Sequence, residues 1–579
     1  MTNKLELKWY GKDNPIQIEP RLLIEDRELS NYENDPGTEN MLIHGDNLLA
    51  LKALENKYAG QVKCIYIDPP YNTGAAFKYY DDNIEHSTWL NLMKPRLEIM
   101  KKLLSDDGII FVQIDDNELA YLTILMDEIF KRNNRINIIS VKMSEASGIK
   151  MTHVNKRLTK IKESILVYKK DKTIINPVKI QKNEWDYEYN KVFKELTISE
   201  KRDLDRIVNN RKNGIHNDSD LKIIDKIFKS KTIDSFRNVM KNEGIDLTTE
   251  NEQKWLKENS FRVFRTATSN SVKKLVDDKK EQCSQTVFSV ESNRDKKIYL
   301  VKSDYSDKSN SPRVHILFAE DYLTQYIGDL WLDIGTTGLE FEGGIDFKNS
   351  KKPERLIERI ITLATKPGDL VLDSFLGSGT TVAVAHKMGR KYIGIEMGNH
   401  AYTHCKVRID KIISGIDMSG ISEKVNWKSG GGYRFYELAP TLINKDIFGE
   451  YVINKEYDAN MLASAVSLHE GFVYQPDSNL FWKQSIGNEN SFLFVTTRHL
   501  DSMYLDSIKD TMEEDEYLVV ACRSFDKEIE NTYPNIAIRK IPQMLLEHCE
   551  FDKTDYNLNI VTPPVYNYEE EDDHDGLHE

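Results

Sequence analysis

The sequence predicts an α/β protein with a doubly wound parallel sheet, and two observations lead to this prediction. First, short apolar runs that end in polar or glycine-rich turns are typical of buried parallel strands. They occupy residues 41–47, 62–71, 107–116, 369–380 and 391–398. Second, apolar residues recur at intervals of three and four at 90–104, 118–130 and 353–365, which indicates helices. Alternating strands and helices build a parallel sheet that binds ligands at the carboxyl ends of its strands.

The strand-forming segments fall into two blocks, so we expect a sheet domain that is interrupted by an inserted domain. The expected parts are an N-terminal arm (1–40), the first part of the sheet domain (41–140), the insert (141–330), the second part (331–435), a carboxyl-terminal domain (436–567) and an acidic tail (568–579). Further strands at 491–497 and 516–524 indicate α+β structure in the carboxyl-terminal domain. The tail is expected to be disordered because its like charges repel.

The composition is that of a folded protein with several cores, since 40% of the 579 residues are hydrophobic and 30% are charged. No run approaches the roughly 18 apolar residues of a membrane helix, and the first residues lack a secretory apolar region. The five cysteines are far apart and form no C-x-x-C pair, which disfavours a disulfide scaffold or structural zinc. We therefore expect a cytoplasmic protein that has no contact with a membrane.

Charge is distributed unevenly, although the net charge of -14 would by itself argue against a nucleic-acid partner. Residues 131–320 hold 41 Lys and Arg against 27 Asp and Glu, whereas the rest of the chain holds 38 against 66. Within this basic part, residues 261–274 alternate aromatic with cationic side chains, as phosphate neutralisation and base stacking require. A solvated lysine-rich surface is the alternative for any short run, but the whole segment favours nucleic acid.

A glycine-rich turn follows the strand at 369–373 in the sequence DSFLGSGTT. Gly377 and Gly379 allow backbone amides to approach a ligand closely. Glu396 ends the next strand, where its carboxylate could accept hydrogen bonds from both hydroxyls of a ribose. The chain has no G-x-x-x-x-G-K-[ST] phosphate loop, so the pattern indicates a nucleoside cofactor; an ordinary tight turn is the alternative.

A second motif, Asp68-Pro69-Pro70-Tyr71, follows the strand at 62–67. Its two prolines fix a rigid extended turn, because they can neither continue a ladder nor enter a helix interior. Asp68 and the Pro69 carbonyl can accept hydrogen bonds from an exocyclic amine, while the Tyr71 ring can stack on a base. The motif fits a flipped-out nucleobase whose amino group is modified; a surface Pro-Pro turn with a capping aspartate is the alternative.

Together the two motifs resemble the β class of S-adenosylmethionine-dependent DNA amino-methyltransferases, in which DPPY precedes F-x-G-x-G. The further elements LKWYGKDNP, HGDNLLALKAL, FVQIDDNE, KKPERLIERII and GGGYRFYEL are similar to the methylation (Mod) subunit of type III restriction-modification systems. The resemblance covers most of residues 1–140 and 330–440. It implies a Rossmann-like methyltransferase domain, with the basic insert as the target-recognition domain.

The resemblance also implies the site residues. Those expected to bind S-adenosylmethionine are Asp46, Asn47, Lys352, Asp373, Phe375, Gly377, Gly379, Thr380 and Glu396. Among them, Asp46 would accept from the adenine amine, Glu396 would meet the ribose, and Thr380 and Lys352 would lie near the methionine end. Asp68, Pro69, Pro70 and Tyr71 would hold the target base. No metal is expected, because the sulfonium methyl is already electrophilic.

The implied function is methyl transfer to the N6 amine of a flipped-out adenine in double-stranded DNA, by a homodimer that an ATP-dependent Res nuclease can join. Adenine is preferred to N4 of cytosine because the family's adenine enzymes usually carry Asp or Asn before the prolines, whereas its cytosine enzymes usually carry Ser. Physical chemistry alone leaves the base open. The alternatives are an RNA or protein-glutamine substrate and a DNA-specificity subunit that acts through a partner nuclease. A dehydrogenase is disfavoured by DPPY.

Overall fold

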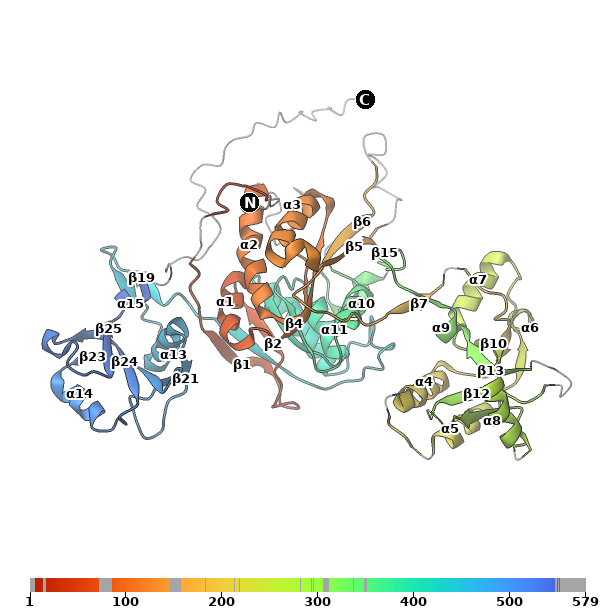
Figure 1. Cartoon of the computed structure of the whole chain (residues 1–579). Helices are drawn as coiled ribbons and strands as arrows, with labels where there is room; N and C mark the ends of the chain where they lie inside the picture. Colours follow the sequence, from red (N-terminus) through yellow and green to blue (C-terminus); the bar gives the residue numbers. More distant parts are fainter. Residues whose placement is uncertain are drawn as a thin grey trace, which may run out of the picture. The chain divides into compact units, whose positions relative to one another are not determined.

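The computed structural model describes two compact units, Met1–Asn176 with Gly328–Glu579, and Pro177–Ile327 (Figure 1). It describes all residues except 1–5, 14–16, 72–85, 145–157, 183, 213, 218, 282, 293, 295, 306–311, 337, 348–350, 547, 548, 550 and 552–579. The predicted acidic tail therefore lies outside the described residues. Among the helices that are described, none has the length and apolar character needed to cross a membrane.

A ten-stranded sheet forms the centre of the first unit. In spatial order its strands are β1 (Leu23–Asn31), β18 (Tyr433–Leu438), β2 (Met41–His44), β17 (Lys391–Glu396), β16 (Leu370–Asp373), β3 (Val62–Ile67), β4 (Leu104–Ile114), β6 (Lys162–Lys169), β5 (Arg135–Lys142) and β15 (Leu330–Trp331). The strands from β18 to β4 are parallel, whereas β1 and β6 run antiparallel to their neighbours. The predicted parallel α/β sheet is confirmed.

Helices cover the sheet because alternate strand residues are apolar on each face. The helices α1 (Asn47–Tyr58), α2 (His86–Leu103) and α3 (Asp116–Met126) share one core with inward residues of β2, β3 and β4 (Figure 1). A second set, α10 (Glu354–Ala364), α11 (Thr380–Lys387) and α12 (Val407–Ile413), packs together beside β3, β16 and β17. The predicted helices at 90–104, 118–130 and 353–365 correspond to α2, α3 and α10.

The order of the strands reverses between β3 and β16. These two strands are neighbours in the sheet, although about 300 residues separate them in the sequence. From β3 the chain continues outward to β4, while from β16 it continues in the opposite direction to β17. Ligands of open α/β sheets bind at such a switch point, because the loops after the two strands diverge and leave a crevice. The DPPY turn and the glycine turn follow these two strands.

Three expected domain boundaries are corrected by strand pairing. The compact insert spans Pro177–Ile327 instead of 141–330, because β6 pairs with β4 and β5 pairs with β6 inside the central sheet. The expected N-terminal arm contains β1, an edge strand that pairs with β18. The second part of the sheet domain continues beyond residue 435, since β18 ends at Leu438.

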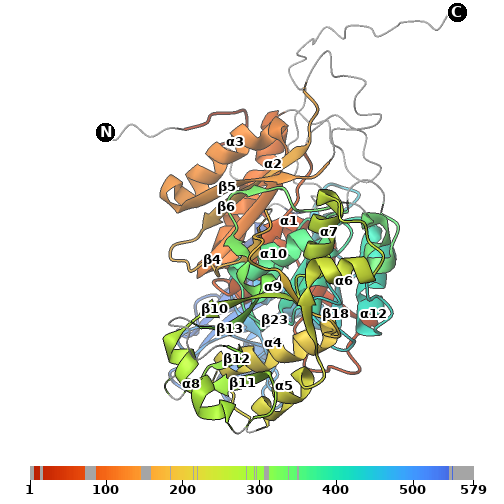
Figure 2. The same cartoon turned by 90° about the vertical axis from the view of Figure 1, so that its right-hand side faces the viewer.

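The second unit is built on a six-stranded sheet with helices around it (Figure 2). Its strands, in spatial order, are β11 (Val287–Glu291), β12 (Ile298–Lys302), β13 (Arg313–Phe318), β10 (Val263–Thr268), β8 (Lys191–Phe193) and β9 (Ile233–Ser235). The helices are α4 (Ile198–Lys212), α5 (Asp220–Phe228), α6 (Phe236–Asn242), α7 (Thr249–Glu258), α8 (Asn270–Lys280) and α9 (Ala319–Tyr322). The ends of the unit pair as β7 (Lys179–Gln181) and β14 (Thr324–Tyr326).

The predicted stacking role of the aromatic and basic run at 261–274 is wrong for Phe264. Phe264 is fully buried in the interior strand β10 and stacks on Phe193, with ring centroids 4.4 Å apart. Alternate residues of a central strand face the core, so this ring is unavailable to a base. The neighbouring Arg265 points outward and pairs with Glu188.

Residues after Leu438 form a smaller mixed sheet. Its strands run in the order β21 (Val473–Tyr474), β22 (Ser485–Ile486), β23 (Ser491–Leu500), β24 (Tyr517–Phe525) and β25 (Ile536–Lys540). The last three are parallel, and the predicted strands at 491–497 and 516–524 correspond to β23 and β24. The remaining elements are β19 (Ile443–Lys445), β20 (Tyr451–Ile453), α13 (Ala459–Glu470), α14 (Ser502–Lys509) and α15 (Gln543–Leu546).

Candidate active site

The predicted site residues come together at the carboxyl edge of the central sheet. Asp68 follows β3, and Asp373 is the last residue of the neighbouring β16, with Leu372 in register with Ile65. Glu396 ends β17, the next strand. Because these strands are parallel, their last residues lie along one edge. The fold therefore places the DPPY turn beside the glycine turn.

The glycine turn is held from within by Asp373. This carboxylate is 2% exposed and accepts hydrogen bonds from the Phe375 amide (3.0 Å) and the Thr381 hydroxyl (2.5 Å). Burial raises the pKa of Asp373 to about 7, against the opposing effect of these two hydrogen bonds. Asp373 therefore braces the turn, and a direct contact between Asp373 and a ligand stays a prediction.

Gly377 lies at the open side of the turn. Its φ of +57° is unfavourable for residues with a Cβ, and a Cβ added there would meet no atom within 4 Å. Its amide donates to Glu396 Oε2 over 2.7 Å. Glu396 is 3% exposed, and its Oε1 lies 2.9 Å from the Gly398 amide and 2.7 Å from His400 Nε2. A ribose would have to share or replace these contacts.

The HGDN segment lies against the same turn. The Gly45 amide donates to the Glu396 carbonyl (3.0 Å), and the Asn47 amide donates to the Ser374 carbonyl (2.7 Å). Asp46 caps α1 by accepting from the amides of residues 48 and 49, and its other oxygen lies 3.3 Å from Arg96. One Asp46 oxygen is thus used by the helix, and its contact with a cofactor adenine stays a prediction.

The DPPY turn is anchored by a buried tryptophan. The Trp89 indole donates to the Pro70 carbonyl over 2.8 Å, and Trp89 is fully buried in α2. Pro69 is buried, while Asp68 and Tyr71 are half-buried. The prolines restrict the backbone and the indole fixes its position, so the turn presents Asp68 and Tyr71 in a defined arrangement.

Lys352 lies with the DPPY residues. Its Nζ is 2.7 Å from Asp68 Oδ2, 3.5 Å from Glu163 Oε2 and 5.0 Å from the centre of the Tyr71 ring. The Tyr71 hydroxyl lies 2.5 Å from Asp68 Oδ1 and 2.7 Å from Glu163 Oε2. Lys352 was predicted near the methionine end of a cofactor. In the structure its ammonium contacts one oxygen of Asp68, the predicted catalytic carboxylate.

Glu163 also belongs to this cluster of side chains (Asp68, Tyr71, Glu163 and Lys352), and neither sequence motif contains it. It comes from β6, and its Oε2 also accepts from Gln113 of β4 over 2.5 Å. Gln113 in turn accepts from the Tyr66 hydroxyl (2.7 Å). The expected insert (141–330) includes residue 163, so the sequence places Glu163 outside the sheet domain and away from the site. The apolar run at 165–168, which begins two residues after Glu163, was the available signal for a buried strand.

The two carboxylates of the cluster, Asp68 and Glu163, differ in their affinity for a proton. Burial raises the pKa of Asp68, and the nearby Lys352 offsets only part of this effect. Burial also acts to raise the pKa of Glu163, but Lys352 and hydrogen bonds from Tyr71 and Gln113 bring it below its ordinary value. Although burial alone would lower it, the pKa of Lys352 is raised by both carboxylates. Such opposed shifts within one cluster are typical of functional sites.

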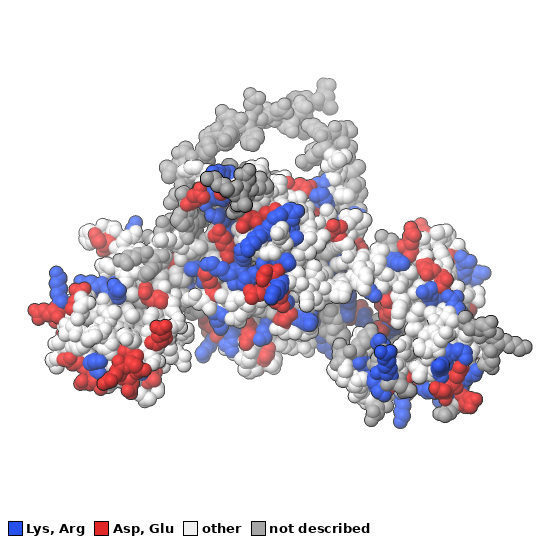
Figure 3. Space-filling model, in the orientation of Figure 1, with Lys and Arg blue, Asp and Glu red and all other residues white. Residues whose placement is uncertain are grey.

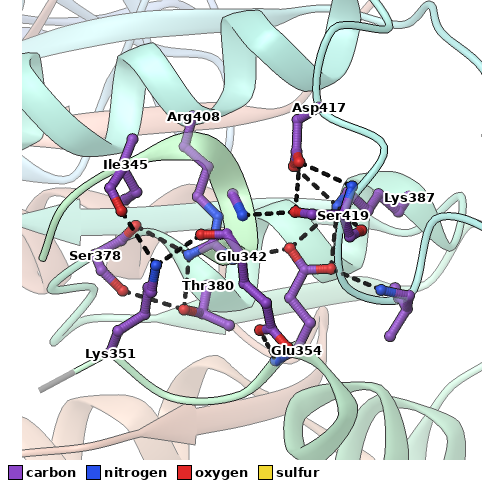
Figure 4. A network of polar contacts seen from close by, with 12 residues as sticks. Glu342, Ile345, Lys351, Glu354, Ser378, Thr380, Lys387, Arg408, Asp417 and Ser419 are labelled. Carbon is purple, nitrogen blue, oxygen red and sulfur yellow. Dashed lines mark hydrogen bonds and ion pairs between the residues drawn. The ribbon is translucent and has the colours of Figure 1, made fainter. Parts of the chain in front are cut away.

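A buried ionic network lies beneath the glycine turn (Figure 4). Arg408 donates to the Thr380 hydroxyl (2.9 Å) and pairs with Glu354 (2.8 Å), and both charged side chains are fully buried. Glu354 also pairs with Lys387. The Thr380 hydroxyl donates to the Lys352 carbonyl over 3.2 Å. The network therefore ties the glycine turn to the segment that carries Lys352.

The DNA methylase family of N6 and N4 enzymes matches residues 62–406, which is more than half of the chain. The chain belongs to this family. It is 38% identical over 440 residues to the probable type III restriction-modification enzyme HindVI Mod subunit of Haemophilus influenzae, covering 71% of this chain and 56% of that protein. It is 27% identical to the type III EcoPI Mod subunit of Escherichia phage P1, covering 67% and 62%. The resemblance to Mod subunits is confirmed, although the chain spans only about three fifths of their length.

Solved structures match this chain at low sequence identity and low TM-score. The PvuII cytosine-N4-specific DNA methyltransferase has a TM-score of 0.31 at 14% identity, covering 67% of this chain and 91% of that one. The M1.HpyAVI-SAM complex has a TM-score of 0.29 at 15% identity, covering 64% and 99%.

Proposed function

We propose that this methylase-family chain transfers a methyl group from S-adenosylmethionine to the exocyclic N6 amine of an adenine in double-stranded DNA. The observation that carries the proposal is the placement of the DPPY turn beside the open glycine turn, on neighbouring parallel strands. One turn offers hydrogen-bond acceptors to an amine, and the other offers backbone amides to a nucleoside cofactor.

The glycine turn fits the proposed cofactor on two observations. A Cβ at Gly377 would point into open space, so a ligand can approach the backbone there. The buried Ser374 hydroxyl has no hydrogen-bond partner among the described residues and can serve a bound polar group. The residues that would hold the cofactor are Asp46, Asn47, Phe375, Gly377, Gly379, Thr380 and Glu396, with Asp373 as the brace of the turn. When bound, S-adenosylmethionine supplies an electrophilic methyl group.

The chain's own contribution is to position the amine and stabilise its charge. The lone pair of an exocyclic amine is delocalised into the ring, which makes the nitrogen a poor nucleophile. Hydrogen bonds from its N–H groups to Asp68 and to the Pro69 carbonyl favour tetrahedral geometry and stabilise the positive charge that develops. The Tyr71 ring supplies a stacking surface for the base. Adenine is proposed as the base because Asp68 precedes the prolines.

The second unit is proposed to recognise the DNA site. Residues 177–320 of the basic segment lie in it and hold 29 Lys and Arg against 24 Asp and Glu, and Figure 3 shows cationic and acidic side chains side by side on its visible face. Phosphate contacts by the cations would make the affinity for DNA fall as the salt concentration rises. A Res nuclease that uses this chain as its specificity subunit is proposed because the relatives are, by name, subunits of type III restriction-modification enzymes. A homodimer is proposed from the family resemblance of the sequence alone.

A methyl-transfer assay with competitors tests the proposal. The purified protein is incubated with S-adenosylmethionine labelled in its methyl group and with DNA from a methylation-free host. We expect label in DNA, undiminished by excess RNA or by a glutamine-containing peptide. Label in RNA or peptide instead of DNA would overturn the choice of substrate, and cofactor binding without any transfer would favour a specificity subunit that needs its partner.

A further inference from the structure

Both oxygens of Asp68 are in use in the cluster. Oδ1 lies 2.5 Å from the Tyr71 hydroxyl, and Oδ2 lies 2.7 Å from Lys352 Nζ. The proposed reaction needs one of these oxygens to accept an N–H of the target amine. Lys352 is itself a nitrogen donor at hydrogen-bond distance from Oδ2. Because a carboxylate oxygen can accept more than one hydrogen bond, an amine could share Oδ2 with Lys352, but it would then lie beside the ammonium.

Glu163 offers Lys352 another position. Three donors converge on Glu163 Oε2, which lies 2.7 Å from the Tyr71 hydroxyl, 2.5 Å from the Gln113 amide and 3.5 Å from Lys352 Nζ. Lys352 thus lies between two carboxylates and is already close to the second. A displacement of its ammonium by less than about 1 Å would give a direct hydrogen bond to Glu163, since such charged contacts are about 2.8 Å long.

The charge of Lys352 makes this movement favourable during the reaction. The target nitrogen becomes positive as it accepts the methyl group, and an ammonium that stayed on Asp68 would repel it at close range. If Lys352 moves to Glu163, the full negative charge of Asp68 faces the developing cation. Glu163 also keeps the displaced ammonium paired, which avoids an uncompensated buried charge.

We infer that Glu163 is a positioning residue that receives the Lys352 ammonium when a target amine binds Asp68. The inference rests on the proposed function and adds a residue that neither sequence motif contains. Glu163 would act through Lys352 and make no contact with the reacting atoms. Its loss would leave Asp68 as the one carboxylate that pairs with Lys352 among the residues that the structure describes, in competition with the amine.

A double-mutant cycle with Glu163→Gln and Lys352→Met tests this coupling. Glutamine keeps a carbonyl acceptor for the Tyr71 hydroxyl, while it removes the charge and replaces the other oxygen with an NH2 donor. We expect Glu163→Gln to lower the single-turnover rate of methyl transfer by about tenfold in the wild-type background, but by less than about threefold when Lys352 is Met. The dissociation constant of S-adenosylmethionine should stay within about twofold of wild type in Glu163→Gln, since this residue lies on the base side.

The same cycle is read by the fluorescence of 2-aminopurine at the target position, which reports extrusion of the base and requires no turnover. The matched control is Glu55→Gln on α1, because Glu55 also pairs with two lysines, Lys52 (2.8 Å) and Lys102 (2.6 Å), away from the strand ends. It should change neither readout.

Equal losses from Glu163→Gln in both backgrounds, by rate and by fluorescence, would contradict the inference and indicate a structural role. The proposed function fails in a different way, namely if the wild-type protein itself transfers no methyl group to DNA, and the inference then fails with it.

Discussion

The two halves of the site are held together in different ways, although they lie on neighbouring strands. In the glycine-turn half (Asp373–Thr381 with Glu396), the carboxylates accept mainly from backbone amides and a neighbouring hydroxyl. In the DPPY half (Asp68–Tyr71 with Glu163 and Lys352), side chains contact other side chains. Backbone contacts fix the first half, whereas side chains can change rotamer and partner. The comparison indicates a preformed cofactor side and a base side that rearranges.

The largest expected effect is the loss of methyl transfer when Asp68 is removed, with little change in cofactor binding. Asp68→Ala should lower methyl transfer by about 100-fold or more, because the amine loses its charged acceptor. The affinity for S-adenosylmethionine should change by less than about threefold, since the glycine turn keeps all of its contacts. Transfer rates and calorimetric binding measure the two effects, and near-normal turnover by the variant would refute the role of Asp68.

Gly377→Val should have the opposite pattern: cofactor binding should weaken, whereas DNA binding should not change. The side chain would enter the open space at the turn and force a branched residue to a φ of +57°, which L-residues avoid. We expect the affinity for S-adenosylmethionine to fall by about tenfold or more, as measured by calorimetry. Binding of DNA without cofactor should be unchanged. Equal weakening of both ligands would show that the halves are not independent.

A smaller effect is expected from Tyr71→Phe. The ring stays available for stacking, but the hydroxyl that lies between Asp68 and Glu163 is lost. We expect the rate of transfer to fall by about three- to tenfold, since a single hydrogen bond in a network is removed. Tyr71→Ala, which also removes the ring, should lose more base capture in the 2-aminopurine assay. If the two variants behave alike, stacking contributes nothing.

The last effect concerns stability instead of methyl transfer: Asp373 should make the free energy of unfolding depend on pH. Its pKa is raised from 3.8 to about 7, so the folded state binds a proton more tightly than the unfolded state does. Asp373 therefore destabilises the fold progressively as the pH rises from about 4 to 7. Relative to wild type, Asp373→Asn should gain about 3 kcal/mol in unfolding free energy between pH 4.5 and pH 7.5. Urea unfolding at both pH values measures it, and a pH-independent difference would contradict the burial effect.

Much of the fold could be predicted because its central strands are continuous apolar runs. The segments at 41–47, 62–71, 107–116, 369–380 and 391–398 all contain strands of the sheet. Edge strands are harder to detect, since they are partly exposed and lack such runs. For this reason the sequence predicts β1 as part of an arm. β6 lies between β4 and β5 inside the sheet and has a buried apolar run, but the expected insert begins at residue 141 and includes it.

The glycine and DPPY motifs could be found from local spacing, but their side-chain partners could not. Glu163 and Lys352 lie far from Asp68 in the sequence and meet it only through the pairing of β6 with β4 and the packing of the segment before α10. Lys352 was assigned to the cofactor by resemblance alone. An ion pair between distant segments leaves no periodic signal in a single sequence.

The central claim is tested most directly by identifying the methylated base. The wild-type protein is incubated with S-adenosylmethionine and DNA from a methylation-free host, and the DNA is digested to nucleosides for mass spectrometry. The account predicts N6-methyladenine. N4-methylcytosine would keep the site and contradict the choice of adenine, while neither product, with the cofactor shown to bind, would contradict the proposal that this chain by itself methylates DNA.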